Sequence, residues 1–138
     1  MKSLQKSIQK SSDPKLSKDF QVDVKVTYVS EESRPESNFH FFAYKILITN
    51  RGVKEAQLMS RHWIITDGFG QVEEVRGAGV IGQQPKIQPG QSFEYESACP
   101  LNTSSGTMRG SYQLISDQGE QFDIEVPEFY LIAPTALH

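Results

Sequence analysis

Apolar and polar residues alternate with a period of two along much of this chain. Between Phe20 and Tyr28 every second residue is apolar, and the residues between them are polar. Successive side chains of a strand point to opposite faces, so this pattern predicts a strand with one face on a core and the other in water. The segment 31–37 that follows is charged and contains Pro35, which predicts a loop.

Six further strands are predicted by the same reasoning, at residues 38–49, 57–66, 71–76, 93–96, 107–116 and 121–132. The second strand, 38–49, is apolar on both faces, as in the centre of a sheet, whereas 71–76 is short and polar, as at an edge. Between strands, Gln88-Pro89-Gly90-Gln91 predicts a type II turn, with glycine at the position that needs a positive φ.

The last predicted strand changes its pattern partway along. Phe122, Ile124 and Val126 share one parity, whereas Phe129 and Leu131 share the other. One extra residue moves all later side chains to the opposite face, and proline lacks the amide that a ladder needs. We therefore predict a bulge or bend at Val126-Pro127.

Strand signals without intervening helices predict an all-β protein. We expect an antiparallel sandwich of about seven strands, similar to the immunoglobulin and fibronectin type III folds, forming one domain over residues 20–138. Residues 1–19 hold five lysines and two aspartates among many small polar residues. This composition predicts a disordered, basic N-terminal tail.

Charge and composition argue against several classes of function. The segment 20–138 carries 9 basic and 15 acidic side chains, so it repels the phosphate backbone of nucleic acids. The start of the chain lacks the apolar run of a secretory signal, and the longest apolar segment, 39–48, is too short to span a membrane. The single cysteine, Cys99, suits a reducing compartment, so we expect a cytoplasmic protein.

A glycine motif, Gly77-x-Gly79-x-x-Gly82, matches the spacing of the dinucleotide-binding fingerprint. That fingerprint needs a following helix, but Val80-Ile81 is β-branched and Pro85 disfavours a helix before it. The motif therefore predicts a tight loop between two strands, and we expect no dinucleotide cofactor. Its alternative is an anion-binding loop whose amides bind phosphate or pyrophosphate, with Arg76 and Lys86 supplying positive charge.

Neither a catalytic group nor a metal site is evident from spacing. The three histidines lie far apart in the sequence, and no residue spacing indicates a nucleophile paired with a base. We interpret Cys99 as structural. Arg61 and Trp63 share a strand face. They are interpreted either as a core tryptophan covered by an arginine stem or as an interaction surface for a partner.

An ordered series of motifs resembles the ApaG family, whose bacterial members are also called CorD. It includes Leu58-x-x-Arg61-x-Trp63-x-Ile65-x-Asp67, the glycine motif with Gln84-Pro85, Pro89-Gly90-x-x-Phe93-x-Tyr95, Gly106-x-Met108-x-Gly110-x-Tyr112 and Phe122-x-Ile124-x-Val126-Pro127. The resemblance runs from about Phe20 to the C-terminus. It implies a fibronectin type III-like sandwich, and it links bacterial members by name to cobalt and magnesium handling and to a diadenosine tetraphosphate hydrolase.

Similar domains in larger eukaryotic proteins, including F-box and DNA-polymerase-interacting proteins, resemble protein-interaction modules. We therefore expect a non-catalytic module that binds another protein, and no role at nucleic acids or membranes. Two alternatives stay open, a phosphate-containing ligand at the loop from Gly77 to Gly82 and weak binding of a divalent cation by surface carboxylates.

Overall fold

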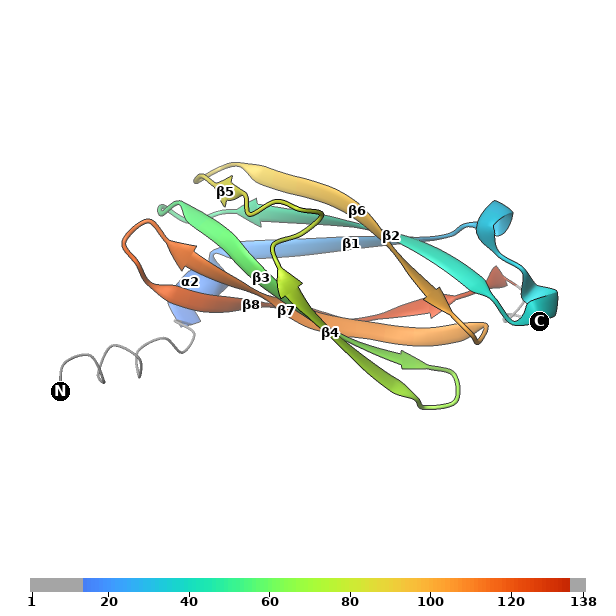
Figure 1. Ribbon diagram of the computed structural model, residues 1–138. Coiled ribbons are helices and arrows are strands. Elements are labelled where there is room, and N and C mark those ends of the chain that lie inside the picture. Colours follow the sequence, from blue (N-terminus) through green and yellow to red (C-terminus); the bar gives the residue numbers. More distant parts are fainter. Residues whose placement is uncertain (1–13, 135–138) are drawn as a thin grey trace.

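The structure is a computed structural model that describes residues 14–134, and strands make up most of them (Figure 1). In chain order the elements are α2 (Pro14–Lys18), β1 (Phe20–Tyr28), η1 (Ser30–Glu32), η2 (Pro35–Ser37), β2 (His40–Asn50), β3 (Ala56–Asp67), β4 (Val72–Ala78), β5 (Lys86–Ile87), β6 (Ser92–Leu101), β7 (Ser105–Ser116) and β8 (Gln121–Ile132). All seven predicted strands are present. The two-residue strand β5 was not predicted.

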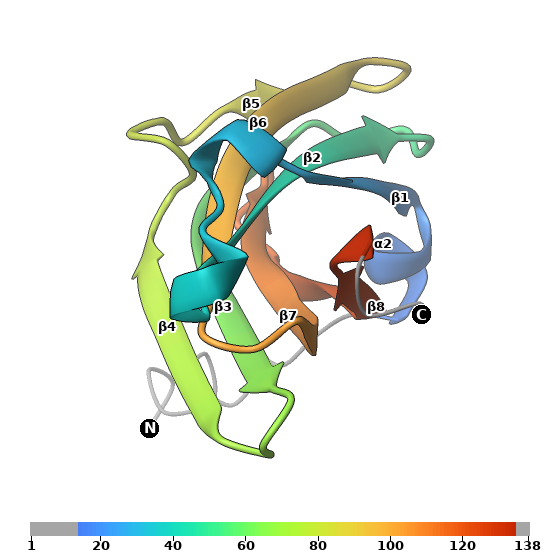
Figure 2. The ribbon, with the colours of Figure 1, turned by 90° about the vertical axis from the view of Figure 1, so that its right-hand side faces the viewer.

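The strands form two antiparallel sheets that pack face to face, as the end-on view in Figure 2 shows. One sheet has the order β1-β2-β6, and the other has the order β4-β3-β7-β8, with β5 paired to the start of β3. The side chains between the sheets form a single core. This arrangement confirms the predicted antiparallel sandwich. Within residues 14–134, the helices are all too short and polar to cross a membrane.

Strand β2 is the central strand of its sheet, as its two apolar faces predicted. It pairs with β1 on one side, where Val24 lies opposite Ile46, and with β6 on the other, where Tyr95 lies opposite Ile46. Phe42, Ile46 and Ile48 are completely buried against the second sheet. Strand β1 exposes alternate residues, as expected of a strand with one solvent-exposed face.

The predicted bulge in the last strand is confirmed. Met108 of β7 pairs with Phe129 of β8, but the next pair is Gly110 with Val126. Two residues of β8, at positions 127 and 128, therefore lie opposite the single residue 109. Burial changes parity at this point, which explains the shift in the apolar pattern.

The prediction of a disordered tail over residues 1–19 was wrong for its last part, and residues 1–13 lie outside the described range. Helix α2 packs against β8, and Leu16 within it is only 6% exposed in the core. Ser17 Oγ donates a hydrogen bond to the Asp123 carbonyl over 2.6 Å. Tertiary contacts rather than local composition order this segment, because a helix this short is stabilised by packing rather than by its own propensity.

Strand β4 is an edge strand, as predicted, and the chain then returns to the same sheet at β5 before it crosses to β6 in the other sheet. Figure 1 shows the connection from β4 to β5 rising close to β6. The next turn is the predicted type II turn, in which Gly90 has φ +83° and the Gln91 amide donates to the Gln88 carbonyl over 2.9 Å. The connection from β4 to β5 contains the glycine motif, so it fixes where that motif lies.

Candidate functional site

The glycine motif forms a tight hairpin. Gly79, Ile81 and Gly82 all have positive φ, and Val80 and Gln83 form an isolated bridge on either side of the turn. The amides of Val80 and Gln83 donate to each other's carbonyls over 2.8 Å, and the Gly79 amide donates to the Met59 carbonyl over 2.8 Å. The Gly79 and Val80 amides of the candidate anion-binding loop are thus bonded within the protein, and residues 79–85 contain no helix.

Arg61 of β3 fixes the beginning of this loop. Its Nη1 atom donates to the carbonyls of Ala78 and Gly79 over 3.1 and 2.8 Å. Gly77 lies opposite Arg61 in the β3–β4 ladder, and a Cβ atom at Gly77 would lie 2.8 Å from the Arg61 Cζ atom. Gly77 therefore lacks a side chain because the guanidinium group occupies that space.

The other two candidates for an anion site lie away from Arg61. Arg76 projects from the outer face of β4, where its Nη2 atom is 3.5 Å from Glu74 Oε1 and its side chain is 71% exposed. Lys86 begins β5, is exposed, and pairs in register with Gln57. The structure thus brings together Arg61, Gly77 and Gly79, whereas Arg76 points to the opposite side of the sheet.

A cleft opens between the two sheets beside this loop, between the edge strands β4 and β6. Its volume is about 270 Å³. Glu73 and Val75 of β4 form one wall and residues 97–100 of β6 form the other; the remaining lining residues are Tyr44, Arg61, Trp63, Ile65 and Met108. The cleft exists because β4 and β6 are each the last strand of their sheet on this side of the sandwich. We call it the β4–β6 cleft.

Trp63 is a core residue that also lines the cleft. It is 2% exposed and makes edge contacts with the rings of Tyr44, Tyr112 and Phe129, with centroid distances of 5.7, 5.8 and 6.1 Å. Its Nε1 atom is buried, and none of the described residues accepts a hydrogen bond from it. Trp63 is thus a core residue, as one of the two interpretations has it, whereas an interaction surface at Arg61 and Trp63 stays a prediction.

Gly110 of β7 leaves room for the ring of Trp63. A Cβ atom at Gly110 would lie 2.7 Å from Trp63 Cε3, so the indole occupies space that a larger residue at position 110 would fill.

The ionisable groups deep in the cleft are neutral near pH 7. Burial, with a smaller contribution from the Glu73 carboxylate, raises the pKa of Cys99 to about 11. Burial likewise raises the pKa of Tyr44, partly opposed by a hydrogen bond to Ser97. A protonated thiol at this pKa is a poor nucleophile, which agrees with the structural interpretation of Cys99.

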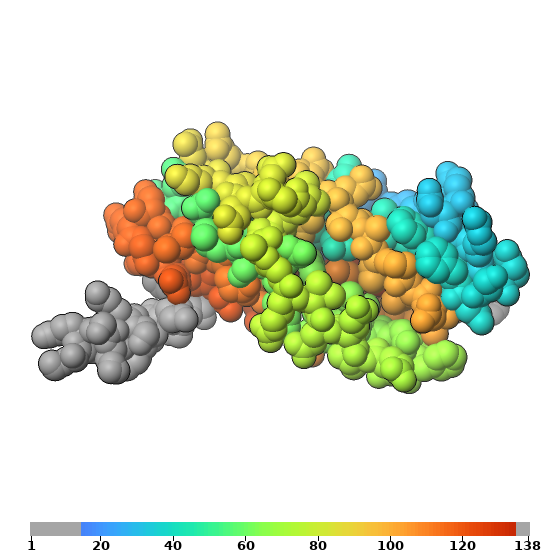
Figure 3. Space-filling view, in the orientation of Figure 1, coloured from blue at the N-terminus to red at the C-terminus, as the bar shows by residue number. Residues whose placement is uncertain are grey.

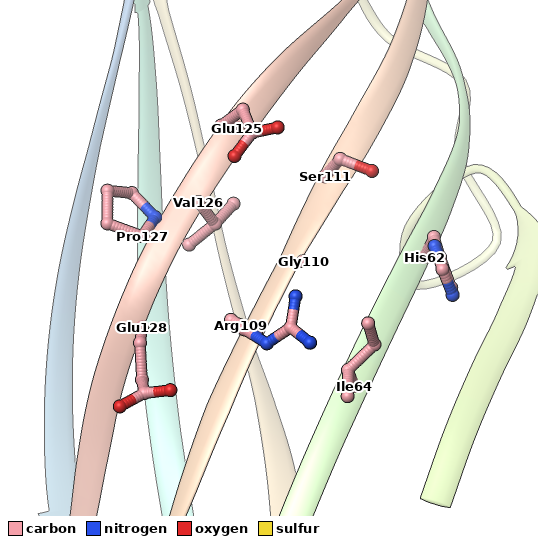
Figure 4. Close-up of a pocket in the computed structure, with 9 residues that line it drawn as sticks. All are labelled: His62, Ile64, Arg109, Gly110, Ser111, Glu125, Val126, Pro127 and Glu128. Atoms are coloured by element: carbon pink, nitrogen blue, oxygen red, sulfur yellow. The ribbon is translucent and has the colours of Figure 1, made fainter.

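A second hollow, of about 280 Å³, lies on the outer face of the β4-β3-β7-β8 sheet, at the β8 bulge (Figure 4). Arg109 and Ser111 from β7, Glu125 and Glu128 from β8, and His62 from β3 surround it. His62 Nε2 lies 3.0 Å from Glu74 Oε1, a hydrogen bond that is the main cause of the lowered pKa of Glu74. The Ser111 hydroxyl accepts a hydrogen bond from Gln113.

These contacts engage His62 and Ser111 with other partners rather than with each other, so they do not form a nucleophile and base pair. Among residues 14–134, no group of three His, Cys, Asp or Glu side chains is arranged to hold a metal ion. The expected weak cation binding by surface carboxylates stays a prediction.

The fold and the cleft define a small two-sheet β-sandwich with an opening between its edge strands. A family model for the ApaG domain matches residues 30–116. Among relatives, the chain is 64% identical over 131 residues to protein ApaG of Bdellovibrio bacteriovorus, covering 95% of this chain and all of that protein. It is 51% identical over 129 residues to protein ApaG of Pseudomonas putida, covering 92% of this chain and 99% of that protein. The chain belongs to the ApaG family.

Solved structures agree with this assignment. A crystal structure of a Bordetella pertussis protein named ApaA superposes with a TM-score of 0.82 at 51% identity, covering 84% of this chain and 94% of that chain. The C-terminal domain of Wzt has a TM-score of 0.53 at 10% identity, covering 83% of this chain and 73% of that domain, which shows a likeness of fold alone. The matched segment 30–116 excludes β1 and β8, although both belong to the same sandwich.

Proposed function

We propose that this protein is a non-catalytic, cytoplasmic protein-binding module that holds an extended segment of its partner along the outer edge of β4. The observation that carries the proposal is that a free strand edge and a cleft into the core lie side by side. No strand among the described residues pairs with the outer edge of β4. A free edge offers backbone groups that an added strand can bond, while an adjacent pocket can select a side chain.

Exposed apolar side chains near both ends of β4 support this proposal. Phe69 is 85% exposed and Val72 61% exposed at the start of the strand, and Ile81 is 53% exposed in the loop beyond its end. Figure 3 shows β4 and this loop, in yellow-green, forming the front of the molecule. Ile81 also has φ +41°, a conformation that β-branched residues rarely adopt and that is often found at functional sites.

Charges along β4 are compatible with a selective rather than a general binding edge. Glu73, Glu74 and Arg76 are exposed and place both signs within four residues. Such charges discourage a strand from pairing with copies of itself. A partner segment with a matching charge pattern would pair without that penalty.

Site-specific photo-crosslinking tests the proposal. A photoreactive phenylalanine analogue at Val72, in the full chain at native abundance, is expected to give a discrete adduct with another protein. The same analogue at Gln21, exposed on β1 at the far edge of the other sheet, should not give that adduct. The adduct at Val72 should weaken in a Phe69→Ser background.

A Tyr130→Ser background is the matched control, because Tyr130 is 64% exposed on β8, away from β4. It should leave the adduct unchanged. Equal adducts from Val72 and Gln21, or an adduct that responds equally to both serine substitutions, would overturn the proposal.

A further inference from the structure

Three connections between strands meet at one end of the sandwich, and a hollow of about 310 Å³ lies between them. They are the residues that lead into β2, the turn from β3 to β4 and the loop from β6 to β7, and Figure 1 shows all three at its right-hand end. We call it the loop-end hollow. The residues that line it include Asn38, His40, Phe69, Asn102, Ser104 and Ser105. Its volume lies at the lower end of the roughly 300–1,000 Å³ of small-molecule pockets, which suits a ligand of one small ring.

Hydrogen bonds between and within the three connections hold the walls of the loop-end hollow in place. The Gly68 amide donates to Thr103 Oγ1 over 2.8 Å, and this hydroxyl donates to the Ser105 carbonyl over 2.8 Å. Asn38 follows η2 in the left-handed conformation, with φ 55°, and its backbone amide donates to the Pro35 carbonyl over 3.0 Å. The walls are therefore preformed, which lowers the entropy cost of binding a ligand.

His40 is the buried polar residue of the loop-end hollow. It is 3% exposed, and its Nδ1 atom lies 3.1 Å from the Tyr28 hydroxyl. Its Nε2 atom forms no hydrogen bond with residues 14–134. Within the same residues, Trp63 Nε1 is the one fully buried side-chain nitrogen or oxygen that lacks a partner. The unbonded Nε2 atom of His40 is therefore not fully buried, and the hollow that His40 lines is where it opens.

The other polar groups of the hollow match ligand atoms that both donate and accept. The side chains of Asn38, Asn102, Ser104 and Ser105 form no hydrogen bond with residues 14–134. An amide offers donors and an acceptor, and the tautomer decides whether Nε2 of a neutral imidazole donates or accepts. A hydroxyl can serve either role, whereas a carboxylate only accepts. None of the described lining residues is Asp, Glu, Lys or Arg, which favours an uncharged ligand with several hydroxyl groups.

An exposed aromatic ring lies beside these polar groups. Phe69 lines the hollow and is 85% exposed, and its backbone amide donates to Asp67 Oδ1 over 2.9 Å, which fixes the turn that carries it. The face of an aromatic ring is electrically negative and attracts weakly positive C–H groups. A sugar ring has C–H groups on its faces and hydroxyl groups around its edge. It therefore matches both the ring of Phe69 and the amide and hydroxyl side chains around it.

We propose that the loop-end hollow binds one sugar unit. The Nε2 atom of His40 bonds one hydroxyl group of the sugar, the amides of Asn38 and Asn102 bond others, and the ring of Phe69 packs on a face of the sugar ring. This inference goes beyond the proposed function and does not depend on it, because the sugar is held at the end of the sandwich rather than along the edge of β4.

NMR titration of the full chain tests the proposal. The probes are the methyl glycosides of glucose, galactose, mannose and N-acetylglucosamine, with cyclohexanol as a ring that has only one hydroxyl group. At least one glycoside at about 10 mM is expected to cause saturable amide shifts confined to the three connections, and cyclohexanol should cause none. The ring-nitrogen signal of His40 should shift with the same apparent Kd. The signal of His62 should not shift, because its Nε2 atom is bonded to Glu74 on the outer face of the sheet.

Two variants remove side chains from the hollow without disturbing the core. Asn38→Gly keeps the backbone, because glycine readily adopts the left-handed conformation, and Asn102 is exposed, so Asn102→Ala should also fold. Each should weaken binding of the glycoside about fivefold, the order of one hydrogen bond. Gln118→Ala is the matched control, since it removes an exposed amide from the turn between β7 and β8 at the opposite end of the sandwich, and it should leave binding unchanged.

Absence of saturable shifts with all four glycosides, equal shifts with cyclohexanol, or unchanged binding in both Asn38→Gly and Asn102→Ala would overturn the sugar site. The outcome is distinguishable from that of the proposed function. Glycoside binding without an adduct from Val72 would refute partner binding at β4 alone. An adduct that is lost in Asn38→Gly, in a protein that binds no glycoside, would assign the hollow to the protein partner and refute the sugar site.

Discussion

Replacing Gly79 by alanine should destabilise the protein by about 3 kcal/mol, and two contributions make up this value. A left-handed conformation costs alanine about 1 kcal/mol, and Gly79 has φ +62°. The new Cβ atom would also lie 2.2 Å from the Gln83 carbonyl oxygen. Relief of this contact requires the hairpin to open, with loss of two hydrogen bonds between Val80 and Gln83 at about 1 kcal/mol each.

Gly70→Ala separates the two contributions. Gly70 has φ +86° but no atom within 4 Å of the position of a Cβ, so only the conformational cost of about 1 kcal/mol applies. The gain from a less flexible unfolded chain is common to both variants and cancels in their difference. The difference in the free energy of unfolding should therefore be about 2 kcal/mol, the part due to crowding.

Urea unfolding followed by the fluorescence of Trp63 measures both values, because this buried residue is the only tryptophan. Gly110→Ala adds a check on crowding alone. Its φ is not positive, yet a Cβ would lie 2.2 Å from the His62 carbonyl oxygen, and we expect a loss of about 2 kcal/mol. If Gly79→Ala cost no more than Gly70→Ala, the tight hairpin and the role of its glycine would both be refuted.

Four further predictions concern the core, the thiol, the helix and the loop. The Tyr95 and Tyr112 hydroxyls lie 2.5 Å apart, so either Tyr→Phe change should cost about 1 kcal/mol, with non-additive losses in the double variant by urea unfolding. Burial raises the pKa of both tyrosines above the usual 10.0, so their contribution to the free energy of unfolding is complete below pH 10 and is lost above it. The free energy of unfolding should therefore fall as the pH rises above 10, and it should fall less steeply in Tyr95→Phe. Alkylation of Cys99 in the folded protein should accelerate only as the pH approaches its pKa of about 11; a rate already maximal at pH 8 would contradict this. Leu16→Ala should cost about 2 kcal/mol, and an unchanged urea midpoint would show that α2 does not pack as described. Pyrophosphate should cause no saturable amide shifts between Gly77 and Gly82, since the Gly79 and Val80 amides there are already bonded; saturable shifts would restore the anion-binding alternative.

Most of the strands could be predicted because their information is local. The alternation in β1, the two apolar faces of β2 and the change of parity at Pro127 each reflect which side chains meet the core. Helix α2 could not be predicted, because its order depends on the contact of Leu16 with the sandwich rather than on the composition of residues 14–18. Strand β5, with two residues, is too short to show any period.

The cleft could not be predicted from local patterns, because it depends on the order of strands in two sheets. Tyr44, Trp63 and Cys99 come from three different strands, and β4 and β6 border the cleft only because both end their sheets on the same side. Trp63 was singled out for its type and its position beside Arg61. Cys99 was interpreted as structural, and nothing in its neighbourhood indicates that it lines an opening.

Unlike the cleft, the pairing of Arg61 with Gly77 has a signal in the sequence. Strands β3 and β4 form a hairpin, and in a hairpin the turn sets the register of every later pair. The turn at Asp67-Gly68-Phe69-Gly70 places Thr66 opposite Val72, and counting five residues outward on each strand reaches Arg61 and Gly77. The presence of glycine at position 77 is therefore explained without phosphate binding. Gly77 makes room for the guanidinium group that donates to the Ala78 and Gly79 carbonyls. The first glycine of a motif that resembles a nucleotide fingerprint thus follows from the packing of one arginine, and that arginine in turn forms part of the wall of the β4–β6 cleft.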